Sequence, residues 1–142
     1  MNTTSPPSVT DAGASSGSSA MRWSGYALSG LVILFMVMDS VMKLLELPVV
    51  IQATIELGYP VETVRGLGLI LLLCTVLYAW PRTAVLGAIL LTAWLGGAVA
   101  THVRVGSPLF SHVLFGVYLG VVLWGGLFLR DARLRALLPL KA

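Results

Sequence analysis

The chain is short for its hydrophobic content, with 142 residues of which 57% are hydrophobic and 11% charged, a net charge of +3 and a mean hydropathy of +0.92. A soluble domain carries about 25% charged residues, and a soluble chain of this length has too little interior to bury so much apolar surface. The composition therefore excludes an ordinary water-soluble domain, and because the few charges flank apolar runs, it also gives no reason to expect a nucleic-acid partner.

The first twenty residues are mostly Ser, Thr, Gly, Ala and Pro, and Asp11 is their only charged residue. Such a segment has too few apolar side chains to offset the entropy lost on ordering, so the sequence predicts a disordered tail over residues 1–21. The tail is not expected to be a signal peptide, because no basic region leads directly into a short apolar stretch.

Four long apolar segments follow the tail. They cover residues 23–45, 61–80, 83–105 and 108–129. Each approaches the ~20 residues that a helix needs to cross ~30 Å of hydrocarbon. The sequence therefore predicts an all-α fold, a transmembrane four-helix bundle over residues 22–138, with a short C-terminal tail at 139–142.

The connections between these segments carry their own signals. Pro48 begins a mostly apolar stretch that ends at Gly58 and Pro60, which predicts a short helix too short to span and therefore interfacial. Residues 80–82 (WPR) predict a tight turn at headgroup level. Ser107 and Pro108 form a helix-starting pair for the last segment.

The distribution of cations predicts the orientation. With four crossings, one side of the membrane carries six of the nine basic residues, namely Arg22, Arg82, Arg130, Arg133, Arg135 and Lys141. The positive-inside rule then places both termini in the cytoplasm.

The opposite side collects polar residues from all four predicted spans. The candidate site residues are Asp39, Lys43, Glu46, Glu62, Arg65, His102, Arg104 and His112. Asp39, Lys43 and Glu46 share one helical face, because they are spaced i, i+4 and i+7. Two interpretations remain open: a salt-bridge cluster that locks helix ends together, or a polar pocket beneath the interfacial helix that binds a quinone, another small amphiphile or a proton.

Other chemistry receives little support. Cys74 lies alone in an apolar run and is expected to be a small buried residue. His102 and His112 flank one loop without further metal-type ligands, so no metal site and no haem is expected. The sequence contains no nucleophile elbow, P-loop or zinc-protease helix, which argues against independent catalytic activity.

Small residues on the last two segments predict close helix packing. Gly116 and Gly120 form a GxxxG pattern, and Ala93, Gly96, Gly97 and Ala100 form a smooth face. We expect these faces to pack within the bundle in preference to forming a dimer interface.

Several short motifs, taken in order, resemble the DoxX-like family of small four-span bacterial membrane proteins. They are residues 39–44 (DSVMKL), 57–60 (LGYP), 80–83 (WPRT), 96–104 (GGAVATHVR), 129–131 (LRD) and 133–135 (RLR). The resemblance covers about residues 28–138 and implies a four-helix fold in a bacterial inner membrane. Distant relatives named DoxD and DoxA are linked to quinone-coupled oxidation of thiosulfate, and some DoxX proteins to redox-stress complexes.

The polar cluster and the resemblance together suggest a redox-associated accessory protein that binds a quinone or a similar amphiphile. The alternatives are a small-molecule transporter or permease, which would need to oligomerise, and a structural partner of another membrane protein. The expected partners are the lipid bilayer and either a second membrane protein or further copies of this chain.

Overall fold

The computed structural model describes residues 10–137, and side chains within that range from residue 19 onward. The elements are α1 (Thr10–Leu44), α2 (Pro48–Glu56), α3 (Thr63–Ala79), α4 (Ala84–Arg104), a π-helical turn η1 (Leu109–Val113), α5 (Leu114–Arg130) and α6 (Ala132–Leu137). No strand occurs between residues 10 and 137. The predicted all-α class is therefore confirmed, and α2 begins at the expected proline.

Three helical segments are long and apolar enough to cross a membrane: Ser19–Leu44 of α1, α4, and the continuous run Leu109–Arg130 of η1 and α5. The fourth predicted span, α3, is apolar but has only 17 residues. The structure thus gives three candidate spans and one shorter apolar helix where the sequence predicts four spans.

The N-terminal segment departs from its prediction. Residues 10–21 belong to helix α1 in the structure, whereas the sequence predicts a disordered tail over this range. No proline lies between Pro7 and Pro48. A helix that already exists in the span therefore extends backwards, because propagation is much easier than nucleation. Residues 1–9 and the predicted tail at 139–142 lie outside the described residues.

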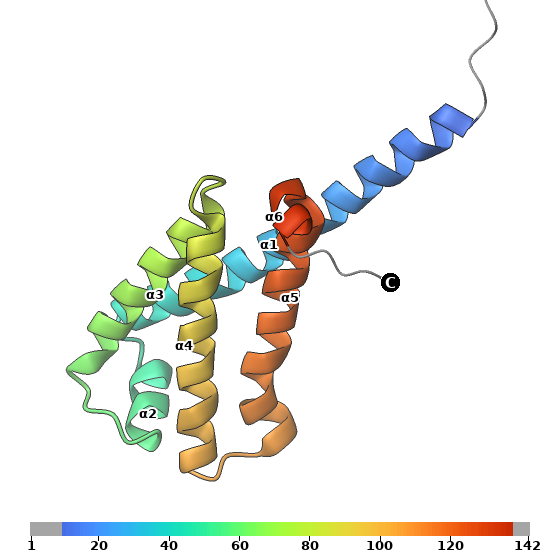
Figure 1. Ribbon diagram of the computed structural model, residues 1–142. Helices are drawn as coiled ribbons and strands as arrows, with labels where there is room; N and C mark the ends of the chain where they lie inside the picture. Colours follow the sequence, from blue (N-terminus) through green and yellow to red (C-terminus); the bar gives the residue numbers. More distant parts are fainter. Residues whose placement is uncertain (1–9, 138–142) are drawn as a thin grey trace, which may run out of the picture.

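The four long helices form a closed ring in the order α1, α3, α4, α5, in which each helix contacts its two neighbours. Figure 1 shows α1 running obliquely across the other three, with α2 and the start of α3 on one side of α4 and α5 on the other. Helices α1 and α4 lie diagonally opposite each other and are not in backbone contact. The two halves of the space between them are filled differently.

The half near the α3–α4 turn is a packed core. Tyr78 is fully buried there, and its hydroxyl donates to the Leu123 carbonyl oxygen at 2.9 Å and shares a hydrogen bond with Ser29 Oγ at 3.1 Å. One side chain on α3 therefore ties α5 and α1 together. Arg130 closes this end, because its Nη2 donates to the Tyr78 carbonyl oxygen at 3.0 Å.

Glycines set the close helix contacts around α1. A Cβ on Gly126 would lie 2.8 Å from Ser29 Oγ, and a Cβ on Gly68 would lie 3.1 Å from the Ser40 carbonyl oxygen. Helix α1 is therefore in near-backbone contact with α5 at Ser29 and with α3 at Ser40. The predicted GxxxG face also packs inside the bundle, since a Cβ on Gly116 would meet Val99 of α4 at 2.8 Å.

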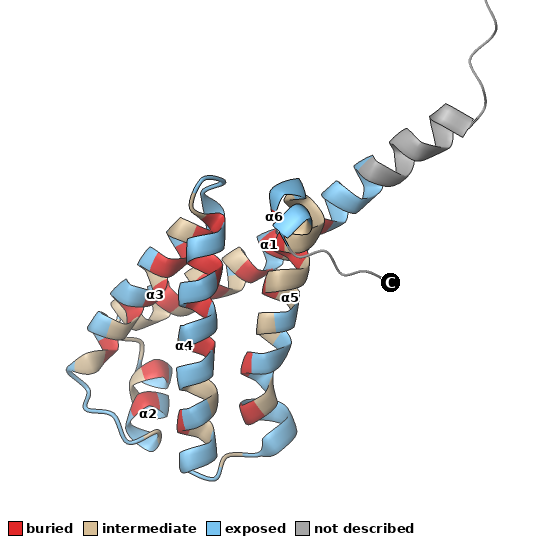
Figure 2. Ribbon diagram, in the orientation of Figure 1, coloured by how far each residue is buried: buried red, intermediate tan, exposed pale blue. Residues whose placement is uncertain are grey.

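The outer surface is apolar. Leu31 and Leu34 on α1, Leu69 and Leu73 on α3 and Val121 on α5 each expose about 60% or more of their surface. Exposed positions recur along the length of α3 and α4 and over the first half of α5 (Figure 2). A soluble protein rarely exposes contiguous apolar surface on this scale. The apolar exterior and the long apolar helices indicate a membrane protein.

Candidate ligand-binding cavity

The other half of the bundle contains a cavity of about 570 Å³. It lies between α1 and α4 and is bordered by α2, α3, η1 and α5. Its lining residues are Phe35, Met36, Asp39, Met42, Lys43, Val49, Val50, Ala53, Thr54, Leu57, Tyr59, Leu67, Ala93, Trp94, Leu95, Gly97, Ala98, Val99, Thr101, His102, His112, Phe115, Gly116 and Leu119. The volume falls within the roughly 300–1,000 Å³ that is usual for small-molecule sites.

Helix α2 and the loop after it form one wall of the cavity. Val50 and Thr54 are buried, and Thr54 Oγ1 donates to the Val50 carbonyl oxygen within α2 at 2.7 Å. The loop then turns at Gly58, whose φ of 81° is in the left-handed region that glycine adopts without strain. This turn directs residues 57–59 towards the end of α4.

Two hydrogen bonds fasten that loop to α4. Tyr59 Oη and Thr101 Oγ1 lie 2.9 Å apart, and Arg104 Nη2 donates to the Leu57 carbonyl oxygen at 2.7 Å. Thr101 also donates within α4, to the Gly97 carbonyl oxygen, at 2.9 Å. The cavity wall is therefore attached to the bundle at the polar end of α4.

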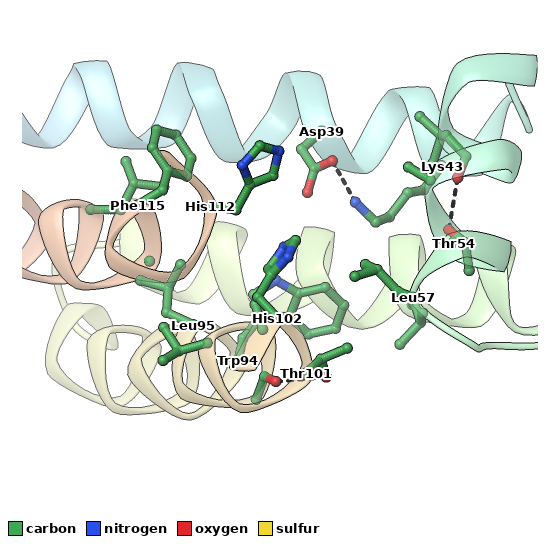
Figure 3. A pocket seen from close by; sticks show the side chains of 18 of the residues that line it. Asp39, Lys43, Thr54, Leu57, Trp94, Leu95, Thr101, His102, His112 and Phe115 are labelled. Atoms are coloured by element: carbon green, nitrogen blue, oxygen red, sulfur yellow. Dashed lines mark hydrogen bonds and ion pairs between the residues drawn. The ribbon is translucent and has the colours of Figure 1, made fainter. Parts of the chain in front are cut away.

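Asp39 and Lys43 form an ion pair on α1, as their i, i+4 spacing predicts. The Lys43 side chain is 16% exposed and the Asp39 side chain 31% exposed, so the pair is largely withdrawn from the surface. Both residues line the cavity, and Figure 3 shows the pair at its α1 side. Their opposite charges compensate each other where a single charge would be costly.

The two histidines also line the cavity, with ring centroids 5.6 Å apart. The Nδ1 atom of His102 shares a hydrogen bond with Ser107 Oγ at 2.9 Å, and the Nδ1 atom of His112 shares one with Ser111 Oγ at 2.7 Å. Serines therefore hold one nitrogen of each ring, and no protein partner among residues 10–137 engages either Nε2. Figure 3 shows the His112 ring beside Asp39, and the His102 ring extending towards them from α4 on the opposite wall of the cavity.

Most of the remaining lining is apolar or aromatic. Phe35 of α1 and Phe115 of α5 pack edge to face with ring centroids 5.4 Å apart, and Trp94 and Leu95 contribute from α4. The cavity therefore combines four ionisable side chains and the hydroxyl groups of Thr54, Tyr59 and Thr101 with an otherwise hydrophobic lining. This combination suits a molecule with a polar head and an apolar body.

Only half of the eight predicted site residues line the cavity, namely Asp39, Lys43, His102 and His112. Arg65 Nε pairs with Glu46 Oε1 at 2.9 Å outside it, and the Arg65 side chain is 69% exposed. Glu62 is exposed at the start of α3, and Arg104 holds the Leu57 carbonyl oxygen. A ligand-binding role stays a prediction for the four lining residues and is not favoured by position for the other four.

The sequence-based reasoning missed the uncharged part of the site. Tyr59 and Trp94 line the cavity, yet a search for ionisable clusters does not select such residues. For Tyr59 a signal existed, since it lies between Gly58 and Pro60 in the turn that ends the interfacial helix. Within the described chain no group of three or more His, Cys, Asp and Glu side chains is arranged to hold a metal ion.

A comparison with known families places the chain. A model of the DoxX-like family matches residues 27–126, well over half of the sequence. The chain belongs to the DoxX-like family. The matched range of this DoxX-like protein includes all eight predicted site residues and every residue that lines the cavity. No curated protein and no solved structure matches the chain.

Proposed function

We propose that the protein crosses a bacterial inner membrane four times, with both termini in the cytoplasm. Helix α3 has 17 residues, the lower limit for a spanning helix, and it packs between α1 and α4, both of which are long enough to span. A turn of four residues joins α3 to α4, so the two helices run in opposite directions. The excess of cations at the end with this turn supports a cytoplasmic position for it.

Cysteine labelling tests this topology. In a Cys74→Ala background, single cysteines at Arg82 and at Gln52 are expected to react with a membrane-impermeant thiol reagent from opposite faces of the membrane. Arg82 lies in the α3–α4 turn, and Gln52 is exposed on α2 at the other end of the bundle. Labelling of both positions from the same face would contradict the fourth crossing.

Within this membrane setting, the proposed role is that of a redox-associated accessory protein that binds a quinone or a similar amphiphile. One observation carries the proposal: a cavity of about 570 Å³ combines apolar and aromatic walls with Asp39, Lys43, His102 and His112 in one region. Lys43 Nζ and an imidazole N–H are donors for a ring carbonyl oxygen, and Asp39 is an acceptor for a hydroxyl group. Phe35 and Phe115 offer aromatic contact to a flat ring.

The packing of the bundle favours binding over transport. A permease built from one copy needs a path from one face of the membrane to the other. Between the cavity and the α3–α4 turn, the interior is occupied by the fully buried side chains of Leu71, Tyr78, Leu91, Leu123 and Leu127. This packed half supports a site that opens in one half of the bundle only.

A binding assay on the purified protein in nanodiscs tests the proposal. We expect His102→Phe to weaken binding of a benzoquinone by about tenfold, the equivalent of one charge-assisted or well-placed hydrogen bond of ~1.4 kcal/mol. Val103→Phe is the matched control, because it places the same side chain at the next position, which is 60% exposed and does not line the cavity.

Two outcomes of this assay would contradict quinone binding at the cavity. If the wild-type protein binds no quinone, or if both variants bind as the wild type does, quinone binding at this cavity is refuted. A stable complex with another membrane protein that forms equally well with His102→Phe would then favour the structural-partner alternative.

A further inference from the structure

We propose that the cavity takes its ligand sideways from the lipid, through an opening beside Gly97 on α4, and that the ligand class is a long-chain amphiphile whose chain stays in that opening. This inference rests on the proposed function, because it concerns the same cavity. It adds the route and the kind of tail, neither of which follows from the polar residues.

The opening is indicated by two small residues on one stripe of α4. Ala93 and Gly97 are spaced i, i+4, both line the cavity, and both are exposed, as are Val49 and Ala53 on the facing helix α2, which also line it. A Cβ built on Gly97 would meet no other atom within 4 Å. Residues that border the cavity and the exterior at once mark the place where the two are continuous.

The arrangement of helices explains why a gap exists there. Near its start α4 packs tightly on α3, since a Cβ on Gly87 would lie 2.1 Å from the Tyr78 nitrogen. Near its end α4 is attached to the loop after α2 through Thr101 and Tyr59. Between these two attachments α4 is not in backbone contact with α2, and Figure 1 shows α2 lying to one side of α4 at this level.

The depth of the opening points to lipid as the source of the ligand. Gly97 lies seven residues before the end of α4 at Arg104, which is about 10 Å along the helix axis at ~1.5 Å per residue. In a helix that spans the bilayer, this level faces acyl chains. Val103, which is two positions after the loop attachment at Thr101, is also 60% exposed and apolar.

The polar region of the cavity fixes the orientation of the ligand. Asp39, Lys43, His102 and His112 hold the head group inside, and Trp94, which is next to Ala93 in the sequence of α4, also lines the cavity. An apolar chain in this path exchanges lipid contacts for contacts with Trp94 and the two small residues. A ligand with a small head and one long chain therefore fits, and a ligand with no chain fills only the inner part.

The experiment compares two adjacent glycines. Gly97→Phe places a bulky ring in the proposed opening. Gly96→Phe is the matched control, because Gly96 is also exposed and an added Cβ there would likewise meet no atom within 4 Å, but Gly96 does not line the cavity. Each variant is measured in nanodiscs with two probes: a benzoquinone that carries a long isoprenoid chain, and the same ring without the chain.

We expect Gly97→Phe to weaken binding of the long-chain quinone by about tenfold or more and to leave binding of the chainless ring unchanged, while Gly96→Phe changes neither. Equal binding of the long-chain quinone by the two variants overturns the lateral opening, and so does an equal loss of both probes in Gly97→Phe. If the wild type binds neither probe, the proposed function itself fails. Thermal unfolding in detergent verifies that each variant is folded, and Ala93→Phe replaces Gly97→Phe if the latter is not.

Discussion

The Asp39–Lys43 ion pair offers a direct measure of how the bundle tolerates charge near its cavity. Breaking a fully buried pair from one side costs roughly 3–5 kcal/mol, because the remaining charge is left uncompensated. The two side chains here are 31% and 16% exposed, so solvation of their exposed part relieves some of that cost. We expect Asp39→Asn and Lys43→Met each to lower the free energy of unfolding by about 2 kcal/mol.

The double variant, Asp39→Asn with Lys43→Met, removes both charges and is expected to lose only about 1 kcal/mol, which gives a coupling energy of about 3 kcal/mol. Equilibrium unfolding by SDS in mixed micelles, followed through the fluorescence of the four tryptophans, measures all four proteins. The Glu46–Arg65 pair is the control: its Arg65 side chain is 69% exposed, so the same cycle should give a coupling of about 0.5 kcal/mol or less.

If the losses in the free energy of unfolding caused by Asp39→Asn and Lys43→Met add in the double variant, the two charges act independently and the ion pair contributes no coupling. A coupling energy for Asp39–Lys43 no larger than that for Glu46–Arg65 would contradict the expectation that burial strengthens the first pair. The double variant is also informative for binding, because a stable protein that no longer binds quinone assigns the pair to the ligand as well as to the fold.

Three further predictions concern stability and use the same unfolding assay. Tyr78→Phe should lower the free energy of unfolding by about 0.6–1.7 kcal/mol, the range for interhelical hydrogen bonds in membranes, because its hydroxyl no longer donates to Leu123; no loss would mean that the bond contributes nothing. Gly87→Ala should lower the free energy of unfolding by about 2 kcal/mol or more, since the new Cβ would lie 2.1 Å from the Tyr78 backbone nitrogen. Gly125→Ala is the control: its Cβ would meet nothing within 4 Å, so it should be neutral or stabilising by up to about 1 kcal/mol. Equal effects at the two glycines would contradict the close contact. Glu46 has a φ of 50°, so Glu46→Gly should be more stable than Glu46→Ala by about 1 kcal/mol, and the reverse order would exclude strain at this residue.

Much of the fold could be predicted because lipid imposes simple rules on a sequence. The long apolar runs located the helices, and Pro48 and Gly58 marked α2 because proline and glycine restrict where helices begin and end. The helix over residues 10–21 could not be predicted from composition. Its polar sequence has no reason to order alone, and it does so only as an extension of a helix that is stabilised elsewhere.

The candidate site was predictable only in its charged part. The i, i+4 spacing of Asp39 and Lys43 fixes their pairing within a single helix. His102 and His112 line the cavity, whereas Glu62 and Arg65 lie outside it. This difference depends on the direction in which each helix end faces. That direction follows from the oblique path of α1 and from the diagonal arrangement of α1 and α4, which no local pattern encodes. The apolar walls were equally hidden, since residues such as Phe35 and Leu95 look like ordinary core.

The two near-backbone contacts of α1, at Ser29 against Gly126 and at Ser40 against Gly68, act as fixed supports for the stretch between them. Helices normally move together until a void is filled. This stretch carries Phe35, Met36 and Asp39. It cannot move closer to α4, because its two ends are already in close contact with the backbones of α5 and α3. The spacing of the cavity walls on the α1 side is therefore set by these two backbone contacts.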